Sequence, residues 1–442
     1  MKLKHVCSIY SDYGLNISAD NYVDEGLPLI RTSDFDDFGQ LHLDTPKYVS
    51  IRDAIGKILK PGDLLFSRSG TVGRCMVFSE KADATYAAYL VRFRTLRHKA
   101  VPRFVFYWSQ SEPFKNQVRV ETIESTIGNF NGTKFSNLIF PEICLEKQRA
   151  IVDFLDRETA RIDQLIEKKQ RLIVLLAARY GTAASDAVSG RTRHAGSMSD
   201  SGLDWIGELP AHWAISRVGW LQKRITYGFT NPMPIADEGP FLLTANDIND
   251  GRILYESARH TTLDAFTHEL TDKSRPQLGD VLLTKDGTLG RVAVHDGREV
   301  CINQSVALLR PMPSRLRSYF LAAVLESQRY QDRLIYEAGG TAIKHIYITR
   351  VAKMPFPLPP LPEQDKIIEE VRLLRARYVT SRDAIRLSIH RLNEFRAALI
   401  TAAVTGQLDA AIWNRRGTND RRADEIEAET FAQPSEPKQV WA

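Results

Sequence analysis

The chain has 442 residues, enough for two to four domains, and its 43% hydrophobic and 26% charged content is typical of a soluble globular protein. It contains no run of about 18 apolar residues and no apolar leader, so we expect neither a membrane helix nor a signal peptide. A net charge of +5 permits nucleic-acid binding without requiring it, and four widely spaced cysteines indicate a reduced cytosolic protein with buried thiols.

The first part of the chain is predicted to form short strands joined by glycine-rich turns. Strand-like runs are LPLIRT (27–32), DLLFS (63–67) and YLVRFRT (89–95), and a helix is expected over residues 103–114. The segment GDLLFSRSGTVGR (62–74) lacks the lysine and spacing of a phosphate-binding loop. We therefore interpret its glycines as parts of a tight hairpin turn that requires positive φ.

A long helix follows over residues 146–190. The segment has no proline, and its apolar residues recur at three-, four- and seven-residue spacings, which predicts a narrow seam of the coiled-coil type. A helix of this length extends roughly 60 Å and must bury its seam on a partner. Residues 191–203 have the composition of a flexible linker.

The second part of the chain repeats the first. GDVLLTKDGTLGR (279–291) restates the turn segment 217 residues later, and further matches follow in order at offsets between 213 and 217. The strands FLLTA, DVLLT and VALLR, a helix over 319–330 and a second long helix over 361–410 are predicted again, before a polar tail at 411–442 that we expect to be disordered. The chain is thus two copies of one α+β unit, and each long helix is the obvious partner of the other.

The predicted seam of the helix pair has members in both helices. They are Ile151, Leu155, Ile162, Leu165, Leu172, Leu176, Ile367, Val371, Leu374, Tyr378, Ile385, Leu392 and Leu399.

Sequence signatures of catalysis are missing. There is no HExxH motif, and GFTNPMP (228–234) departs from the Asn-Pro-Pro-aromatic motif of adenine methyltransferases at Met233 and Pro234. The ten histidines are scattered, and no acid–base pair or nucleophile arrangement recurs between the copies. We predict no catalytic residues, no metal site and no cofactor.

The order and duplication of the motifs resemble the specificity subunit of Type I restriction–modification enzymes. The resemblance rests on the two turn segments, on DWIGELPAHWAISRVG (204–219), on INQSVALLRP (302–311) and on PLPPLPEQDKIIEEV (357–371), and it covers roughly residues 1–410.

The resemblance implies an α+β fold in which two target recognition domains alternate with two long helices that pair as an antiparallel coiled coil, with internal pseudo-two-fold symmetry. The implied domains are residues 1–145 and 204–360, with the conserved helices at 146–190 and 361–410. Each domain would read one half of a bipartite site in double-stranded DNA, and the helix pair would set the spacer. The implied partners are two modification (methyltransferase) subunits and the ATP-dependent restriction subunits, which would carry the catalysis, in the cytoplasm and with no membrane.

Within this resemblance, projecting turns are the expected place for base contacts. Arg68-Ser69 differs from Lys285-Asp286, and readers of different half-sites should differ where they touch bases. The recurring Gly70, Thr71 and Arg74 are expected to serve turn structure or phosphate contact. The candidates for DNA contact are Arg68, Ser69, Thr71, Arg74, Asn129, Asn131, Lys134, Lys285, Asp286, Thr288, Arg291, Asn303, Gln304, Thr341, Lys344 and His345. The candidates for phosphate contact are Arg92, Arg94, Arg97, Arg315 and Arg317.

Two other interpretations stay open at this point. The chain can be a non-catalytic binding protein, with two domains on a coiled-coil spacer and a protein or carbohydrate ligand. It can also be an enzyme, a nuclease or methyltransferase, whose site has no familiar signature. The basic residues late in each copy argue against the first interpretation. A purified chain without activity and without S-adenosylmethionine binding would count against the second.

Overall fold

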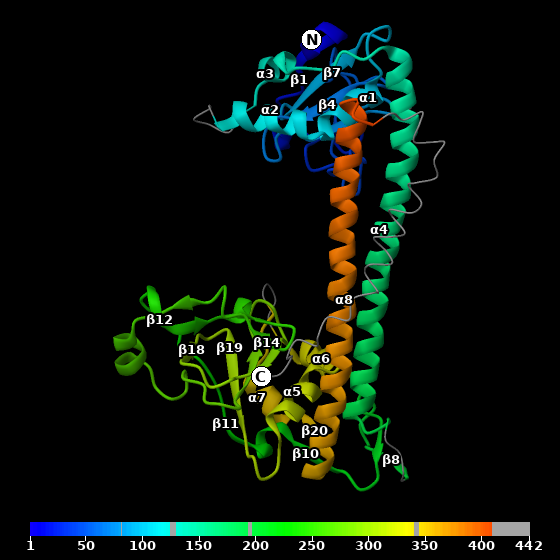
Figure 1. The fold of residues 1–442 in the computed structure, drawn as a ribbon. Helices are drawn as coiled ribbons and strands as arrows, with labels where there is room; N and C mark the ends of the chain where they lie inside the picture. Colours follow the sequence, from blue (N-terminus) through cyan, green and yellow to red (C-terminus); the bar gives the residue numbers. More distant parts are fainter. Residues whose placement is uncertain (81, 124–129, 193–196, 340–343, 409–442) are drawn as a thin grey trace. The chain divides into compact units, whose positions relative to one another are not determined.

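The computed structural model describes residues 1–80, 82–123, 130–192, 197–339 and 344–408. The expectations for Asn129, Thr341 and the tail at 411–442 lie outside these residues. The described residues form two compact units: unit 1 comprises Met1–Gln170 with residues 384–408, and unit 2 comprises Arg171–Asp383. Both long helices contribute to each unit (Figure 1).

Unit 1 contains a four-stranded antiparallel sheet in the order β1-β7-β4-β5 and a smaller sheet in the order β3-β2-β6. Its strands are β1 (Cys7–Tyr13), β2 (Leu27–Ile30), β3 (Tyr48–Val49), β4 (Leu64–Ser67), β5 (Cys75–Val77), β6 (Thr85–Tyr86) and β7 (Leu90–Thr95). Its α-helices are α1 (Pro102–Gln110), α2 (Glu112–Ile123), α3 (Gly132–Asn137), the first part of α4 (Leu145–Val188) and the last part of α8 (Leu361–Val404).

Unit 2 repeats this arrangement. Its four-stranded sheet has the order β11-β19-β16-β17, and a smaller sheet has the order β15-β12-β18. In both small sheets the central strand pairs antiparallel on one side and parallel on the other. The internal repeat predicted from the sequence is therefore a repeat of strand order and direction.

The strands of unit 2 are β8 (Met198–Asp200), β9 (Glu208–Pro210), β10 (Ala214–Arg217), β11 (Gln222–Tyr227), β12 (Ala236–Leu243), β13 (Ile248–Asn249), β14 (Arg252–Ile253), β15 (Arg259–His260), β16 (Val281–Thr284), β17 (Val292–Val294), β18 (Val300–Ile302), β19 (Val306–Pro311) and β20 (Pro355–Leu358). Its α-helices are the last part of α4, α5 (Ser318–Glu326), α6 (Gln328–Glu337), α7 (Ile348–Lys353) and the first part of α8 (Leu361–Val404).

The two long helices run antiparallel within each unit. In unit 1 the beginning of α4 packs against the end of α8, where Leu155 and Ile162 share a buried cluster with Leu392 and Leu399. In unit 2 the end of α4 meets the beginning of α8, and Tyr180 stacks on Tyr378 with ring centroids 5.0 Å apart. Pairing of the two long helices, expected from the sequence, is confirmed.

The seam differs from the prediction at one position. Leu172 is 38% exposed, because the buried stripe of α4 continues from Ile162 through Ile166 and Lys169, which are 8% and 7% exposed. A straight helix with 3.6 residues per turn drifts away from a strict seven-residue repeat, and this drift turns Leu172 outward. The remaining predicted seam residues are buried or half-buried.

Three further expectations are corrected. The single helices predicted at 103–114 and 319–330 are each two helices, because Ser111 and Ser327 are extended and their hydroxyls donate to carbonyls three residues back at 2.7 and 2.6 Å. The expected linker at 191–203 includes β8, which pairs with β9. Cys144 is exposed, unlike the other three cysteines.

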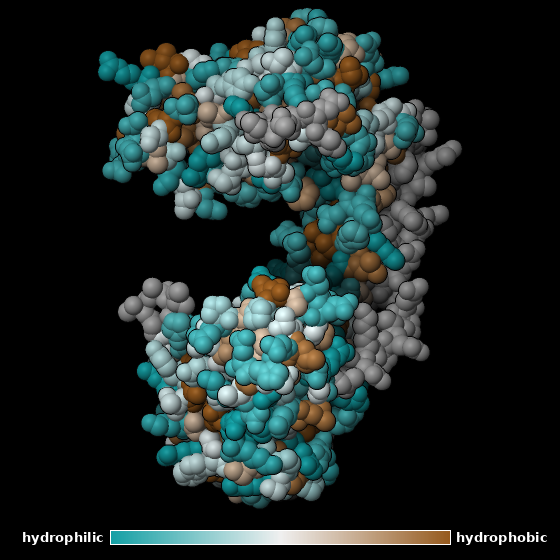
Figure 2. Space-filling model, turned by 90° about the vertical axis from the view of Figure 1, so that its left-hand side faces the viewer, coloured by the Kyte–Doolittle hydropathy of each residue, from teal (hydrophilic) through white to brown (hydrophobic). Residues whose placement is uncertain are grey.

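Burial raises the pKa of the Cys7 and Cys301 thiols to about 12, so these thiols stay protonated and unreactive near neutral pH. No helix in the described part of the chain is both long and apolar enough to cross a membrane. On the face shown in Figure 2, hydrophilic residues cover most of both globular regions and hydrophobic residues are scattered between them.

Candidate nucleic-acid interface

In each unit, one terminus of each of the four strands lies along the same side of the four-stranded sheet, perpendicular to the strands. β1 and β4 end at this edge and β5 and β7 begin there, because neighbouring strands are antiparallel. The ends of β11 and β16 and the beginnings of β17 and β19 meet in the same way. The duplicated turn joins β4 to β5 and β16 to β17, so we call this edge the turn edge.

Backbone hydrogen bonds give the duplicated turn the same shape in both units. Ser67 N donates to Arg74 O at 2.8 Å and Gly73 N donates to Ser67 O at 2.9 Å, and the two corresponding bonds in unit 2 are both 2.9 Å. Gly73 and Gly290 have φ of +86° and +80°, a region that strains other residues. The predicted hairpin turn with positive φ is confirmed.

A buried aspartate at the start of each turn segment is paired with an arginine of the neighbouring strand. Arg94 donates to Asp63 at 2.6 and 2.7 Å, and Arg310 donates to Asp280 at 2.8 and 2.7 Å. The hydrogen bonds to Asp63 raise the pKa of Arg94. Both carboxylates are at most 2% exposed and the two arginines are half-buried, so each pair ties the arginine to a carboxylate of the domain's interior.

Arg92 is also engaged inside unit 1. It is 5% exposed, and it donates to Asp12 at 2.5 Å and to the carbonyl of Ile58 at 3.0 Å. An arginine whose charge is buried and balanced by a carboxylate presents little charge to a phosphate. Arg92 and Arg94, predicted as phosphate contacts, therefore do not enter the interface proposed below.

The other three candidates for phosphate contact lie at the opposite edge of the sheets. β7 and β19 begin at the turn edge and run away from it, and Arg97, Arg315 and Arg317 follow their far ends. Arg317 donates to Asp365 at the start of α8 at 2.9 Å. The structure thus does not bring these arginines together with the duplicated turns.

The closing arginines of the turn segments bind a neighbouring loop of their own domain. Arg74 donates to Asp37 Oδ1 at 2.7 Å and to the carbonyl of Phe35 at 3.2 Å. Arg291 donates to the carbonyl of Ile248, also at 3.2 Å. Of the two roles expected for the recurring arginines, this geometry favours turn structure.

At the tip of each turn a cation lies over a tyrosine. The Arg68 guanidinium is 5.0 Å from the centre of the Tyr13 ring, and Lys285 Nζ is 5.4 Å from that of Tyr227. Both tyrosines end the first strand of their sheet. Neither tyrosine was predicted as a site residue from the sequence, although the two recur 214 residues apart and this recurrence could have identified them.

The two tips differ in charge. Asp286 accepts from Lys285 Nζ at 2.6 Å and lies 2.6 Å from His345 Nδ1, with Lys344 exposed beside them. The structure therefore brings together four residues that were predicted from separate segments. Ser69 in unit 1 has no carboxylate, and Thr71 and Thr288 stand on the same turns, exposed and half-buried respectively.

The loop that precedes β7 in unit 1, or β19 in unit 2, contacts the duplicated turn at the turn edge. Arg68 N donates to Tyr89 O at 3.0 Å, and Lys285 N donates to Ser305 O at 2.8 Å. This contact places Asn303 and Gln304 of unit 2 next to its turn.

Asn303 and Gln304 have alanines, Ala87 and Ala88, as their counterparts in unit 1. The two amides line a hollow of about 710 Å³ whose walls are partly polar and partly apolar. The polar side chains around the hollow are Thr230, Asn231, Thr244, Asn246, Asp247, Ser257, Arg259, Asn303 and Gln304. Asn303 Oδ1 already accepts from Ser305, whereas Gln304 is exposed.

A third loop, which precedes α3 in unit 1 and α7 in unit 2, also contacts the duplicated turn. Phe130 N donates to Arg68 O at 3.2 Å, and the counterpart bond in unit 2 joins Ile346 to Lys285 at 2.9 Å. Asn131 caps α3 by accepting from Lys134 N at 2.9 Å, and Lys134 Nζ donates to the carbonyl of a residue near the end of α2 at 2.6 Å. Asn131 and Lys134 therefore shape this loop.

Among the described residues, no group of three or more His, Cys, Asp or Glu side chains is placed to hold a metal ion.

Comparisons with known proteins bear on the family of the chain. The family described as "Type I restriction modification DNA specificity domain" matches residues 1–174 and 235–374. The Type I restriction enzyme EcoBI specificity subunit of Escherichia coli is 22% identical over 424 residues, covering 93% of this chain and 86% of its own. The StySPI specificity subunit of Salmonella potsdam is 21% identical over 411 residues, covering 88% and 84%.

A solved structure described as "Structural basis underlying complex assembly and conformational transition of the type I R-M system" shares the fold, with a TM-score of 0.64 at 18% identity. The match covers 92% of this chain and 97% of that one. The alternative of a two-domain protein that binds protein or carbohydrate is not favoured by these matches. Two copies of the matched domain, each joined to a long helix, place the chain in the family of Type I restriction–modification DNA specificity subunits.

Proposed function

We propose that the turn edge of each unit reads one half of a bipartite site in double-stranded DNA. The observation that carries this proposal is that the duplicated turn combines recurring structural residues with tip residues that differ between the units. Its glycines and buried aspartate make the same contacts twice, and both closing arginines bind a backbone carbonyl of the neighbouring loop, whereas the tip residues Arg68 and Lys285 differ and are half-buried. A shared scaffold with different tips is what two readers of different sequences require.

The chemistry of the edge suits duplex DNA. Arginine and lysine bind guanine edges, amides bind adenine edges, and lysines also neutralise phosphates. Unit 1 offers Arg68 with the exposed Tyr89, and unit 2 offers Lys285, Lys344 and the amide of Gln304. Specificity for two unlike half-sites follows from these differences.

The limits of the two domains are part of the proposal. We take residues 1–145 and 204–360 as the target recognition domains, and the closure of each domain supports this choice. In unit 2, β10 pairs with β20, so the beginning and end of the domain lie together. In unit 1, Lys2 and Ile139 form the corresponding antiparallel bridge.

The helix pair, at 146–190 and 361–410, would hold the two domains at a fixed separation and so set the unread spacer. Half-sites one helical turn apart lie roughly 34–36 Å from each other, and helices of about 60 Å are long enough to serve that distance. Helix residues outside the seam would dock two modification subunits. Methyl transfer and ATP-dependent cleavage would belong to modification and restriction subunits, in the cytoplasm where host DNA lies.

The test is co-expression of the chain with the modification subunit encoded beside it, followed by single-molecule sequencing of host DNA for N6-methyladenine. We expect one bipartite methylated motif that disappears when this chain is deleted. Replacing residues 205–355 by those of a relative should change one half of the motif only. Methylation that is unaffected by the deletion would contradict the proposal, and a motif changed in both halves would contradict the assignment of one domain to one half-site.

A further inference from the structure

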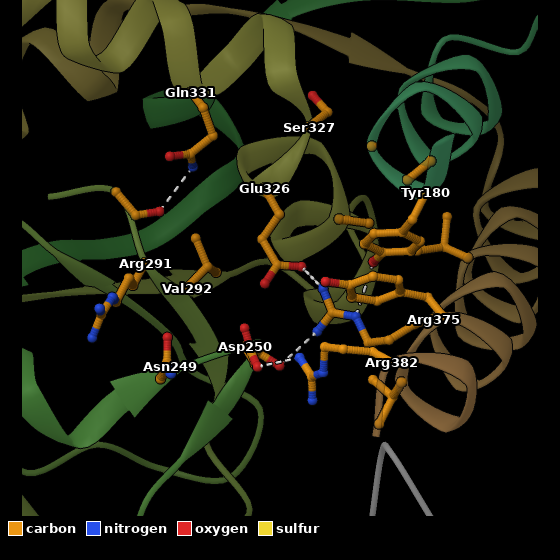
Figure 3. Close-up of a pocket in the computed structure, with 18 of the residues that line it drawn as sticks. Tyr180, Asn249, Asp250, Arg291, Val292, Glu326, Ser327, Gln331, Arg375 and Arg382 are labelled. Atoms are coloured by element: carbon orange, nitrogen blue, oxygen red, sulfur yellow. Dashed lines mark hydrogen bonds and ion pairs between the residues drawn. The ribbon is translucent and has the colours of Figure 1, made fainter. Parts of the chain in front are cut away.

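In each unit a short loop of the domain lies between the helix pair and the duplicated turn. In unit 2 this loop is the turn at Asp250–Gly251 that joins β13 to β14, and in unit 1 it comprises Asp37 and Phe38. We call these two loops the connectors. Figure 3 shows the connector of unit 2 beside a hollow of about 340 Å³ that is lined by residues of the domain and of both long helices.

Two arginines of α8 hold the connector of unit 2. Arg375 Nη1 donates to the Asp250 carbonyl at 3.3 Å, and Arg382 Nη1 donates to the Asp250 carboxylate at 2.7 Å (Figure 3). Gly251 has φ of +73°, and a Cβ on it would clash with Arg375 Nη1. The fit between helix and connector therefore leaves no room for a side chain.

The arginine that makes this contact is itself fixed. Arg375 is 6% exposed, forms an ion pair with Glu326 at the end of α5, and donates through Nε to the Tyr180 hydroxyl at 3.0 Å. Tyr180 comes from α4, so one guanidinium joins both long helices, the domain's α5 and the connector (Figure 3). Its position cannot shift without breaking several of these contacts.

The strand that leads into the connector, β13, is bound by the duplicated turn. Arg291 donates to the carbonyl of Ile248, two residues before Asp250, at 3.2 Å. A continuous set of contacts thus leads from α8 through the connector to the closing arginine of the turn that carries Lys285. The tip residues are fixed relative to the helix pair by this route as well as by the sheet.

Unit 1 reaches the same arrangement with different side chains. Arg396 of α8 lies 4.5 Å from the centre of the Phe38 ring and donates to Asp163 of α4 and Gln110 of α1, both at 3.0 Å. Arg74 binds the other side of that connector, donating to Asp37 at 2.7 Å. What recurs is the position of the contact rather than its chemistry.

We propose that Arg74 and Arg291 are positioning residues, which set the register of each reading tip on the helix pair and thereby the spacer length that the protein accepts. This inference rests on the proposed function. It assigns to the closing arginines a role apart from base reading, and it accounts for their recurrence in two turns whose tips differ. A tip held at a fixed place on the helices meets its half-site only at one spacing, since misplacement by about 1 Å is enough to impair a positioned contact.

The test uses the complex of this chain with its modification subunits and a set of DNA duplexes. The duplexes carry the two half-sites at the natural spacer and at spacers one base pair shorter and longer. Arg291→Gln and Arg382→Gln are compared with the wild type, and Arg298→Gln is the matched control, since Arg298 is exposed on another loop of the same domain. Thermal unfolding of each variant identifies those that are folded.

We expect Arg291→Gln and Arg382→Gln to reduce the preference for the natural spacer by about tenfold, with unchanged base preference in both half-sites. Arg298→Gln should keep the wild-type preference. An altered base preference in the second half-site would make Arg291 a reader and overturn the proposal. A uniform loss of methylation at all three spacers would make it a phosphate contact, which also overturns it. Failure of the proposed function is a separate outcome, in which the wild-type complex methylates no bipartite motif.

Discussion

Gln148 of α4 and Gln364 of α8 make the same three hydrogen bonds 216 residues apart. Each side-chain oxygen accepts from a backbone N–H at the start of the first domain helix, that of Val101 at 2.9 Å or that of Arg317 at 2.8 Å. Each side-chain nitrogen donates to two carbonyls, at 3.1 and 2.7 Å in unit 1 and at 3.0 Å twice in unit 2. These buried glutamines fasten each domain to the beginning of its long helix.

Gln364→Ala should therefore destabilise unit 2. The substitution removes three hydrogen bonds of a buried side chain and leaves the N–H of Arg317 without its partner, and we expect the free energy of unfolding to fall by about 3 kcal/mol. Urea unfolding of the full chain measures the loss, and hydrogen exchange locates it. Gln164→Ala, on the exposed face of α4, is the control and should change stability by less than about 0.5 kcal/mol. Equal effects of the two substitutions would contradict this role.

The stability of unit 1 should depend on the ionisation of Asp12. Burial raises the pKa of Asp12, but hydrogen bonds from Lys57 and Tyr86 and the charge of Arg92 lower it, and the net pKa is below the ordinary value. A carboxyl with a depressed pKa stabilises the fold above its unfolded pKa, about 3.9, and this contribution is lost as the pH falls through the folded pKa. The loss therefore begins below about pH 4.

Hydrogen exchange of β1 and β7 between about pH 5 and pH 2.5 measures this dependence. The wild type should lose protection as the pH falls, and Asp12→Asn should be less protected at pH 5 and vary less with pH. Asp153→Asn, at an exposed position of α4, should keep the wild-type profile. An Asp12→Asn profile with the full wild-type slope would show that other carboxyls cause the acid sensitivity.

The amides of unit 2 should determine part of one half-site. Replacing Asn303 and Gln304 by alanine gives unit 2 the residues that unit 1 has at 87 and 88. A lost bidentate contact to a base removes about 1–3 kcal/mol of discrimination, so the preference at one or two positions of the second half-site should weaken. The methylated motif, sequenced from host DNA, shows the change. A motif that keeps both halves intact would exclude these amides from base reading.

The salt dependence of DNA binding should distinguish the two edges of the unit 1 sheet. Arg68→Gln, at the turn edge, should reduce the slope of log affinity against log salt by about one if Arg68 neutralises a phosphate, or change a base preference if it reads a base. Arg97→Gln, at the opposite edge, should change neither. Titration of the complex on labelled duplexes at several salt concentrations gives both slopes. If only Arg97→Gln reduced the slope, the DNA would bind at the opposite edge of the sheet, and our proposal would be wrong.

Local patterns in the sequence predict much of this molecule. The glycines at 73 and 290 predict turns with positive φ, apolar periodicity predicts the long helices, and the constant offset predicts the repeat. The placement of the arginines was not predictable in the same way. Whether Arg92 faces a carboxylate or solvent depends on Asp12, 80 residues earlier in the chain. Which edge Arg97 occupies depends on strand order, which no local pattern encodes.

The duplicated turn also bears on how such a protein changes over time. Its shape is set by main-chain bonds, two glycines and a buried ion pair, none of which involves the side chain of Arg68, Ser69, Lys285 or Asp286. Mutations at these tips therefore cost the fold little, whereas they alter the surface that the turn presents. Single substitutions at the tips can therefore change the sequence preference without rebuilding the turn beneath them.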